Sequence, residues 1–215
     1  MIYNNMSPWK YCSSEKKLIR KLKKFSGKTW DGRDVGGNQL GAEKRNSIRQ
    51  LKIRIRCHLD MAQKNNFDNQ LRCAYCGSVM RITSSPEIEH IANKARYPEF
   101  MFYPLNLVLA CHLCNFPEKK GQQNIISVYD NNYKLCQFTI VHPILDDRTQ
   151  FITNLVDHSD GTLILTSDEP KGKETIKMFK LNEECYLSNR YNEFLMKQIR
   201  NSSHKEKILE CLGYE

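Results

Sequence analysis

Two Cys-x-x-Cys pairs are the strongest chemical signal in this sequence of 215 residues. Cys73 and Cys76 form the first pair, and Cys111 and Cys114 form the second, with 34 residues between the pairs. Each pair offers two thiolates from one tight turn, and two such pairs can close a tetrahedral zinc site. Taken alone, the pattern is typical of a structural zinc ion, so we predict zinc at these four cysteines.

Other groups with chemical potential lie between the two pairs and just after them. Glu89 and His90 belong to an alternating run that predicts a strand, in which neighbouring side chains point to opposite faces unless the strand bends. Asn106 precedes the apolar run 107–110, and Asn115 directly follows the last zinc cysteine, where we expect a helix to begin. A lone histidine in a strand is more often a core residue, but here it occurs together with a carboxylate and two amides.

The combination resembles the zinc-containing branch of the HNH endonucleases, the His-Me finger or ββα-metal group. The resemblance rests on Glu89, His90, Asn106 and Asn115 framed by the four cysteines, and it covers about fifty residues, the size of a small metal-dependent module. It implies an α+β fold with a zinc-stapled ββα-metal core. Many relatives read His-Ile-x-Pro where this chain reads 90–93 as His-Ile-Ala-Asn.

The resemblance also implies roles for these residues. His90 would be the general base that takes a proton from water, and Glu89 with Asn115 would hold Mg²⁺ or Mn²⁺ near the scissile phosphate. Asn106 would either hydrogen-bond the loop that follows His90 or orient the imidazole, and we favour the first. Glu87 is either part of the metal shell or a surface acid.

Two further expectations concern residues around the second cysteine pair. We expect His112 to be exposed and not a metal ligand. Many relatives carry a lysine three residues after the final His or Asn, where this chain has Glu118. Lys119 and Lys120 are therefore the candidates for backbone phosphate contacts, although a shift of one residue on a helix turns a side chain by about 100°.

The net charge of +9 is concentrated in the N-terminal third. Residues 1–70 hold 16 Lys or Arg against 6 Asp or Glu, whereas residues 126–215 hold 11 against 14. Within 42–65, apolar residues recur at helical spacing and predict a buried stripe: Ile48, Leu51, Ile55, Leu59 and Ala62. A second stripe a quarter turn away is cationic: Arg45, Arg49, Lys52 and Arg56. It is either a solvated face or a surface for a polyanion, and nucleic acid is the expected partner.

The sequence divides into three parts. Residues 1–70 are expected to be a basic helical region with helices at 13–25 and 42–65, joined by a glycine-rich loop that carries no phosphate-loop spacing. By the resemblance, residues 71–125 are expected to form the HNH core with its zinc knuckles. Residues 126–215 are expected to be a small α+β extension that binds a partner, with strands at 137–141 and 162–166 and helical periodicity over 174–199.

The location of the chain is expected to be cytoplasmic, with no membrane partner. Its first residues show no signal-peptide pattern, and no run approaches the roughly 18 apolar residues of a membrane span. Cysteines outside the two pairs are then expected to be small buried hydrophobes. These are Cys12, Cys57, Cys136, Cys185 and Cys211.

A second resemblance concerns the flanks of the core. The runs 90–98, 102–111, 141–147 and 175–182 are similar to bacterial defence-associated HNH proteins of the PtuB family, found in Septu-type and retron-linked systems. That family implies a nuclease effector of anti-phage defence that works beside a PtuA-like ATPase of the ABC/SMC type and retron components. The substrate would be DNA or structured RNA such as tRNA. The alternatives are a stand-alone HNH DNase of a mobile element and a catalytically silent nucleic-acid-binding zinc module.

Overall fold

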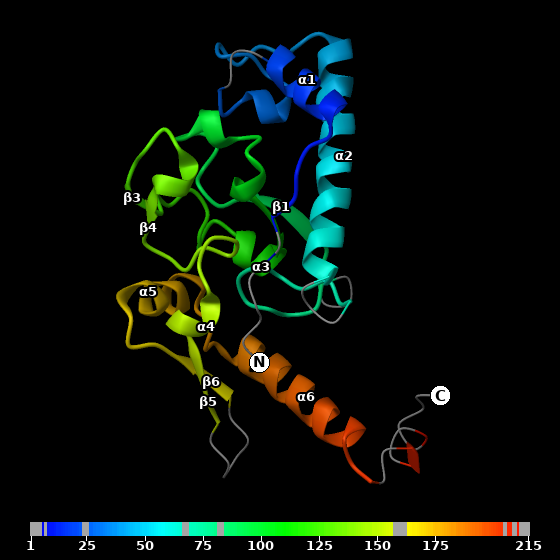
Figure 1. The fold of residues 1–215 in the computed structure, drawn as a ribbon, viewed down its shortest axis with the longest axis vertical. Coiled ribbons are helices and arrows are strands. Elements are labelled where there is room, and N and C mark those ends of the chain that lie inside the picture. The colour runs from blue at the N-terminus through cyan, green and yellow to red at the C-terminus, as the bar shows by residue number, and fades with distance from the viewer. Residues whose placement is uncertain are drawn as a thin grey trace.

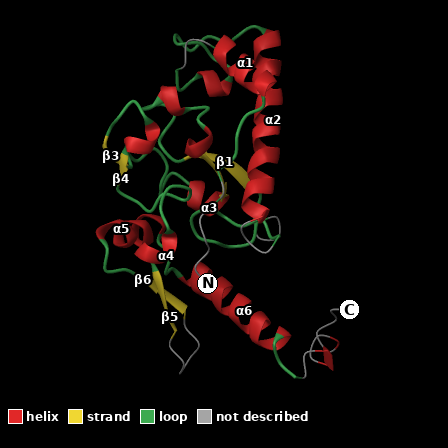
Figure 2. Cartoon of the chain, viewed as in Figure 1, coloured by secondary structure: helices red, strands yellow, loops and turns green. Residues whose placement is uncertain are grey.

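The computed structural model describes residues 6, 8–22, 26–65, 69–80, 84–156, 163–203, 206–207 and 210. The fold is mixed α+β, as predicted, and the described part contains three separate two-stranded antiparallel sheets. Figure 1 shows the long helix α2 along one side of the molecule, the first hairpin beside its lower half, and α6 extending away from the C-terminal part. Figure 2 shows that loops make up much of the middle of the chain.

The N-terminal region contains two helices and a short turn of 3-10 helix. Helix α1 spans Ser13–Lys21, η1 spans Thr29–Asp31, and α2 spans Ala42–Asn65. Ion pairs from Arg54 and His58 on α2 to the buried Glu15 on α1 hold the two helices together. Helix α2 has the predicted bounds, and its apolar stripe is buried as expected. Phe25, the expected end of the first helix, lies outside the described residues.

The central hairpin and the short helix after it carry the second cysteine pair and the candidate catalytic residues. Strand β1, Pro86–His90, pairs antiparallel with β2, Leu107–Cys111, so that Glu87 lies opposite Ala110 and His90 opposite Leu107. The short helix α3, His112–Asn115, follows directly. Between the strands lie η2, Pro98–Phe100, and η3, Pro104–Asn106. Asn115 therefore ends a short helix and does not begin one, which corrects that expectation.

Buried Gln63 fixes α2 on the hairpin. Its amide oxygen accepts a hydrogen bond from the backbone nitrogen of Leu109 at 2.6 Å, and its amide nitrogen donates to the carbonyl of Leu109 at 3.0 Å. A second donated bond reaches the carbonyl of Arg72 at 2.8 Å. Because a buried amide without partners costs free energy, these three bonds select one position of α2 along β2.

The C-terminal part contains two hairpins and two main helices. Strand β3, Ile126–Val128, pairs with β4, Gln137–Phe138, and η4, Tyr133–Leu135, lies between them. Helix α4, Arg148–Phe151, precedes β5, Thr153–Val156, which pairs with β6, Leu163–Thr166. Helices α5, Pro170–Phe179, and α6, Glu184–Arg200, complete it.

Three details of this part differ from the sequence-based expectations. The periodicity over 174–199 belongs to two helices, because Lys180 ends α5 with a positive φ of 50°. The strand expected at 137–141 extends only over 137–138, and β3 and β5 were not predicted. Thr162 of the other expected strand lies outside the described residues.

The single cysteines also differ from expectation. Cys136 is buried as predicted, but Cys12, at the N-cap of α1, and Cys57 and Cys185, on α2 and α6, are exposed. Cys211 lies outside the described residues. No helix within the described ranges is both long enough and apolar enough to cross a bilayer.

Candidate active site

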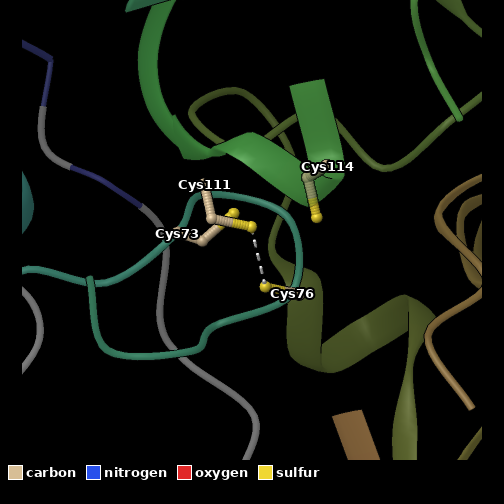
Figure 3. A group of neighbouring side chains, drawn as sticks. All are labelled: Cys73, Cys76, Cys111 and Cys114. Carbon is tan, nitrogen blue, oxygen red and sulfur yellow. Dashed lines mark hydrogen bonds between the residues drawn. The ribbon is translucent and has the colours of Figure 1, made fainter. Parts of the chain in front are cut away.

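The four predicted zinc ligands lie together in the interior. The Sγ atoms of Cys73, Cys76, Cys111 and Cys114 all lie within 4.8 Å of one another, and Figure 3 shows them converging from the loop before β1 and from the end of β2 with α3. The Sγ atoms of Cys76 and Cys111 are 3.8 Å apart. A tetrahedron with Zn–S bonds of roughly 2.3 Å has edges of about 3.8 Å. The cluster therefore has the size and the donor type that suit a metal ion such as zinc.

The first cysteine pair is held in a tight knuckle. The backbone nitrogen of Gly77 donates to the carbonyl of Cys73 at 3.0 Å, and Gly77 has a φ of 76°. This left-handed conformation strains residues with a Cβ, so glycine is the residue that lets the chain turn back immediately after Cys76. The backbone nitrogen of Cys73 also donates to the carbonyl of Ser78 at 2.9 Å.

His90 is buried at the end of β1, and one of its ring nitrogens is fixed. Nε2 lies 3.1 Å from the carbonyl oxygen of Met101. Since a carbonyl oxygen only accepts, Nε2 must carry the hydrogen, and Nδ1 is then the nitrogen with a free lone pair. Among the described residues, none hydrogen-bonds Nδ1. Burial, with the charges of Lys94, Lys120 and Lys52, lowers the pKa of His90 to about 3, so the ring is neutral at pH 7.

The ring of His90 is also held by an aromatic contact. The rings of His90 and Trp30 pack edge to face, with their centroids 4.5 Å apart and an interplanar angle of 84°. Trp30 in turn packs on Phe102, in the loop that follows β1. Together with the bond to Met101, this contact leaves the imidazole one orientation, as a proton acceptor requires.

Asn106 performs the first of the two jobs considered for it. Its amide oxygen accepts from the backbone nitrogen of Ala92 at 2.6 Å and from the Tyr133 hydroxyl at 2.9 Å. Its amide nitrogen donates to the carbonyls of Ala92 and Phe100 at 3.1 and 3.0 Å. The side chain is fully buried with every hydrogen-bonding position used. Asn106 therefore ties down the loop after His90 and does not touch the imidazole.

Glu89 and Asn115 have different partners. The Glu89 carboxylate forms a buried ion pair with Lys120, whose ammonium also donates to the carbonyl of His90 at 2.7 Å. Burial raises the pKa of Glu89 above its ordinary value, although Lys120 opposes the shift. Asn115 donates instead to the carboxylate of Glu87 at 2.6 Å. The two predicted cation ligands are thus not brought together among the described contacts.

Glu87 on β1 contacts two residues of α3, Asn115 and His112. Its carboxylate lies 2.8 Å from Nδ1 of His112, which is exposed as predicted and is not part of the cysteine cluster. Partial burial raises the pKa of Glu87, but the hydrogen bonds from Asn115 and His112 outweigh it and bring the pKa below its usual value. Glu87 is therefore an ionised, partly accessible carboxylate beside Asn115.

Lys119 and Lys120 are not surface residues. Lys119 donates to the carbonyl of Phe179, to Tyr186 and to Glu183 at 3.0, 3.0 and 3.1 Å, and Lys120 is almost fully buried beside Glu89. Their ammonium groups are engaged inside the protein, so this placement does not fit the predicted phosphate contacts. Lys119 instead connects the segment after α3 to the C-terminal helices, and Lys120 connects it to β1.

The cationic stripe of α2 leads to the His90 region. Arg45, Arg49 and Arg56 are exposed, and Lys52 is half-buried. The ammonium of Lys52 lies 4.7 Å from the centre of the Trp30 ring, the same ring that contacts His90. Burial lowers the pKa of Lys52, while the neighbouring Asp31 opposes this shift.

Sequence reasoning missed Trp30, Asp31 and Lys94. Lys94 lies in the loop after His90, pairs with Asp31 at 2.9 Å, and lies 5.9 Å from the Trp30 ring. The signal for Trp30 was weak, because a tryptophan in a glycine-rich loop has no helical or strand periodicity around it. Its neighbours come from α2 and from the loop after β1, which are far apart in the sequence.

Comparison with known proteins gives two partial similarities. Septu protein PtuB of Bacillus mycoides (strain KBAB4) is 24% identical over 178 residues, which are 71% of this chain and 58% of PtuB. Protein ea31 of Escherichia phage lambda is 42% identical over 97 residues, which are 43% of this chain and 29% of ea31. No protein-family model matches the chain. The chain thus has distant similarity to a Septu protein, and it spans little more than half the length of one curated relative and under a third of the other.

Proposed function

We propose that this chain is a metal-dependent HNH endonuclease that hydrolyses phosphodiester bonds of DNA or of structured RNA such as tRNA. The observation that carries the proposal is the setting of His90. Its imidazole lies at the end of a hairpin whose second strand leads into the cysteine cluster, with Nε2–H donated to the carbonyl of Met101 and Nδ1 left with a free lone pair. A histidine held in one tautomer is what a general base needs.

The proposed reaction begins with a water molecule beside Nδ1 of His90. Nδ1 takes a proton from the water as the water oxygen attacks phosphorus, and the bond from phosphorus to the leaving oxygen breaks. The bond to Met101 and the contact with Trp30 keep the acceptor nitrogen aimed during this transfer. Asn106 supports it indirectly, because three of its hydrogen bonds, to Ala92 and Phe100, fix the loop that carries Met101.

The proposal includes a catalytic cation near the scissile phosphate. A bound Mg²⁺ or Mn²⁺ would supply positive charge at the scissile phosphate. Glu89 and Asn115 have separate partners in the described arrangement, Lys120 and Glu87. Glu89 becomes available to a cation only when Lys120 releases it, whereas Glu87 already contacts Asn115 and is the alternative carboxylate ligand. At the cysteine cluster we propose zinc, because four thiolates are soft donors that prefer it to Mg²⁺.

Substrate contacts are proposed for the cationic side of α2 and the loop beside it. Arg45, Arg49 and Arg56 project their guanidinium groups from α2, while Lys52 and Lys94 flank the Trp30 ring that touches His90. Cations in a row that passes the proposed base would place a phosphate backbone across it. Lys119 and Lys120 have no part in these contacts.

The biological setting is proposed from the similarity to a Septu protein. We infer that the chain is the nuclease effector of an anti-phage defence system, located in the cytoplasm, and that it works with a PtuA-like ATPase of the ABC/SMC type and with retron components. A stand-alone DNase of a mobile element and a catalytically silent binding module are the alternatives. The partly similar ea31 of a phage is compatible with the first of these.

The decisive experiment is the substitution His90→Ala. Cleavage of plasmid DNA and of tRNA with added Mg²⁺ or Mn²⁺ should fall by about 10²- to 10⁴-fold, while zinc content and nucleic-acid affinity stay close to those of the unchanged protein. His58→Gln, which changes a histidine on α2, is the matched control and should retain activity. Near-native cleavage by His90→Ala, or its rescue by added metal, would exclude His90 as the base.

A further inference from the structure

A pocket lies in the N-terminal region, apart from the hairpin. It has a volume of about 420 Å³ and lies between the end of α1, the glycine-rich loop and the start of α2. Leu22, Val35 and Leu40 give it an apolar lining, and Val35 is 61% exposed at this place. Pockets of roughly 300–1,000 Å³ are typical of small-ligand sites, and this one is large enough for a nucleotide.

The charged lining of the pocket is mainly cationic. Lys21, at the end of α1, and Lys44, in the first turn of α2, are exposed and form no ion pair with any residue in the described ranges. Arg33 donates to the carbonyl of Gly37 at 3.0 Å. The carboxylate of Asp34 is engaged by the backbone nitrogen of Asn38 at 2.8 Å. The two free ammonium groups beside an apolar lining suit an anion that also carries a flat apolar body.

The pocket is connected to the proposed base through three consecutive residues. Thr29 lines the pocket, Trp30 packs against His90, and Asp31 pairs with Lys94 in the loop after β1. Along α2, Lys44 of the pocket and Lys52 beside Trp30 are eight residues apart, which is about 12 Å at 1.5 Å per residue. This distance separates the pocket from the proposed base by only a few nucleotides of a bound strand.

We propose that this pocket binds one unpaired nucleotide of the substrate strand, a few nucleotides from the bond that is cut. The base lies against Leu22, Val35 and Leu40, and its phosphates lie between Lys21 and Lys44. This inference rests on the proposed function and deepens it, because the enzyme then requires a single-stranded or locally opened substrate. Base-paired nucleotides are too bulky for such a pocket, since the partner base would have to enter with them.

The test measures binding without cleavage. A fluorescein-labelled ten-nucleotide strand of thymidylate and a duplex of the same length are titrated with the full chain, without added Mg²⁺ or Mn²⁺, by fluorescence anisotropy. Val35→Trp fills the pocket without a change in charge, and its control is Val128→Trp on β3, where the side chain is also exposed. Lys21→Glu with Lys44→Glu removes the pocket cations, and its control is Lys16→Glu with Lys17→Glu on the exposed side of α1.

Both pocket variants should weaken single-strand binding by about tenfold or more relative to their controls, which corresponds to the loss of one nucleotide contact. Zinc content and the thermal unfolding midpoint verify that each variant folds. A pocket variant that folds and binds like its control overturns the assignment, as does unchanged protein that prefers the duplex.

Two further outcomes separate the pocket from the nuclease. If thymidine 5′-monophosphate alone binds as tightly as the ten-nucleotide strand, the pocket serves a free nucleotide and the assignment to the substrate strand is wrong. If the pocket variants lose single-strand affinity but the unchanged protein cleaves nothing, the pocket is supported and the nuclease proposal fails. If the unchanged protein cleaves nucleic acid but does not bind the single strand, the nuclease proposal is supported and the pocket assignment fails.

Discussion

The buried ion pair of Glu89 and Lys120 predicts a large and specific loss of stability on substitution of the lysine. Lys120→Met keeps most of the apolar stem but leaves the Glu89 carboxylate in the interior without its counter-charge. Removing one partner of a buried pair costs about 3–5 kcal/mol, because the remaining charge must be neutralised or exposed. Lys120 also donates to the carbonyl of His90, so the variant loses a second bond there.

Urea unfolding followed by far-ultraviolet circular dichroism measures this loss, at pH 7.5 and in excess zinc. The matched control is Lys94→Met, which breaks the ion pair with Asp31. This pair is more exposed than that of Glu89 and Lys120, so its loss should cost about 0–1 kcal/mol. The double variant Lys120→Met with Glu89→Leu replaces both charges by apolar groups. It should recover at least half of the loss, because buried pairs are often matched by apolar residues of similar size.

The pH dependence of the Lys120→Met variant adds an independent check. Burial already raises the pKa of Glu89, and loss of Lys120 raises it further. A carboxyl with a raised folded-state pKa favours the folded state below its unfolded-state pKa and loses that contribution as pH rises through the folded-state pKa. The deficit of the variant should therefore be larger at pH 8 than at pH 5. A deficit below about 1 kcal/mol at every pH would show that the pair is not buried in solution, contrary to this reasoning.

Three other predictions concern separate parts of the molecule. The purified protein should contain one zinc per chain, and Cys73→Ser should lower both the zinc content and the unfolding midpoint, since metal binding and folding are coupled; active protein without zinc in elemental analysis would contradict this. Arg49→Ala with Lys52→Ala should weaken nucleic-acid binding and reduce the slope of log affinity against log salt concentration by about 1–2. An unchanged slope would show that the cationic face of α2 contacts only solvent. Burial, followed by the charge of Lys171, lowers the pKa of His142 to about 3. The free energy of unfolding should therefore fall as pH decreases from about 6.5, where the histidine of the unfolded chain takes up its proton. His142→Gln should reduce the fall in this free energy between pH 7 and pH 5 by about 2 kcal/mol in urea titrations.

Local features of the sequence predicted those elements whose signals are local. The cysteine spacing indicated the cluster because each pair makes its own knuckle, and the stripe of apolar residues predicted α2 with its bounds because burial on one side of a helix repeats along the chain. The strand at β1 was visible from alternation. The break between α5 and α6 was not predicted. The residue that ends α5 in the left-handed conformation is Lys180, whereas the sequence signal for such an end is usually a glycine.

The partners of charged side chains could not be predicted in the same way. Lys119 follows the zinc knuckle, where exposure is the usual expectation for a lysine, but it contacts Phe179, Glu183 and Tyr186 more than fifty residues later in the sequence. Asn115 meets Glu87 and not Glu89 because of the place that α3 takes beside β1. Such pairings depend on tertiary packing, which no periodicity in a single sequence encodes.

Hydrogen bonds from the C-terminal part reach the region of the proposed base. Tyr133 donates its hydroxyl hydrogen to Asn106 and lies 3.0 Å from Nε2 of His142. Because Nδ1 of His142 accepts from the backbone nitrogens of Ile144 and Leu145, its hydrogen is on Nε2 and is donated to Tyr133. A buried chain of hydrogen bonds therefore runs from the loop at 142–145 through Tyr133 to Asn106. Since Asn106 fixes the loop that carries Met101, removal of the Tyr133 hydroxyl should loosen the very contact that orients His90.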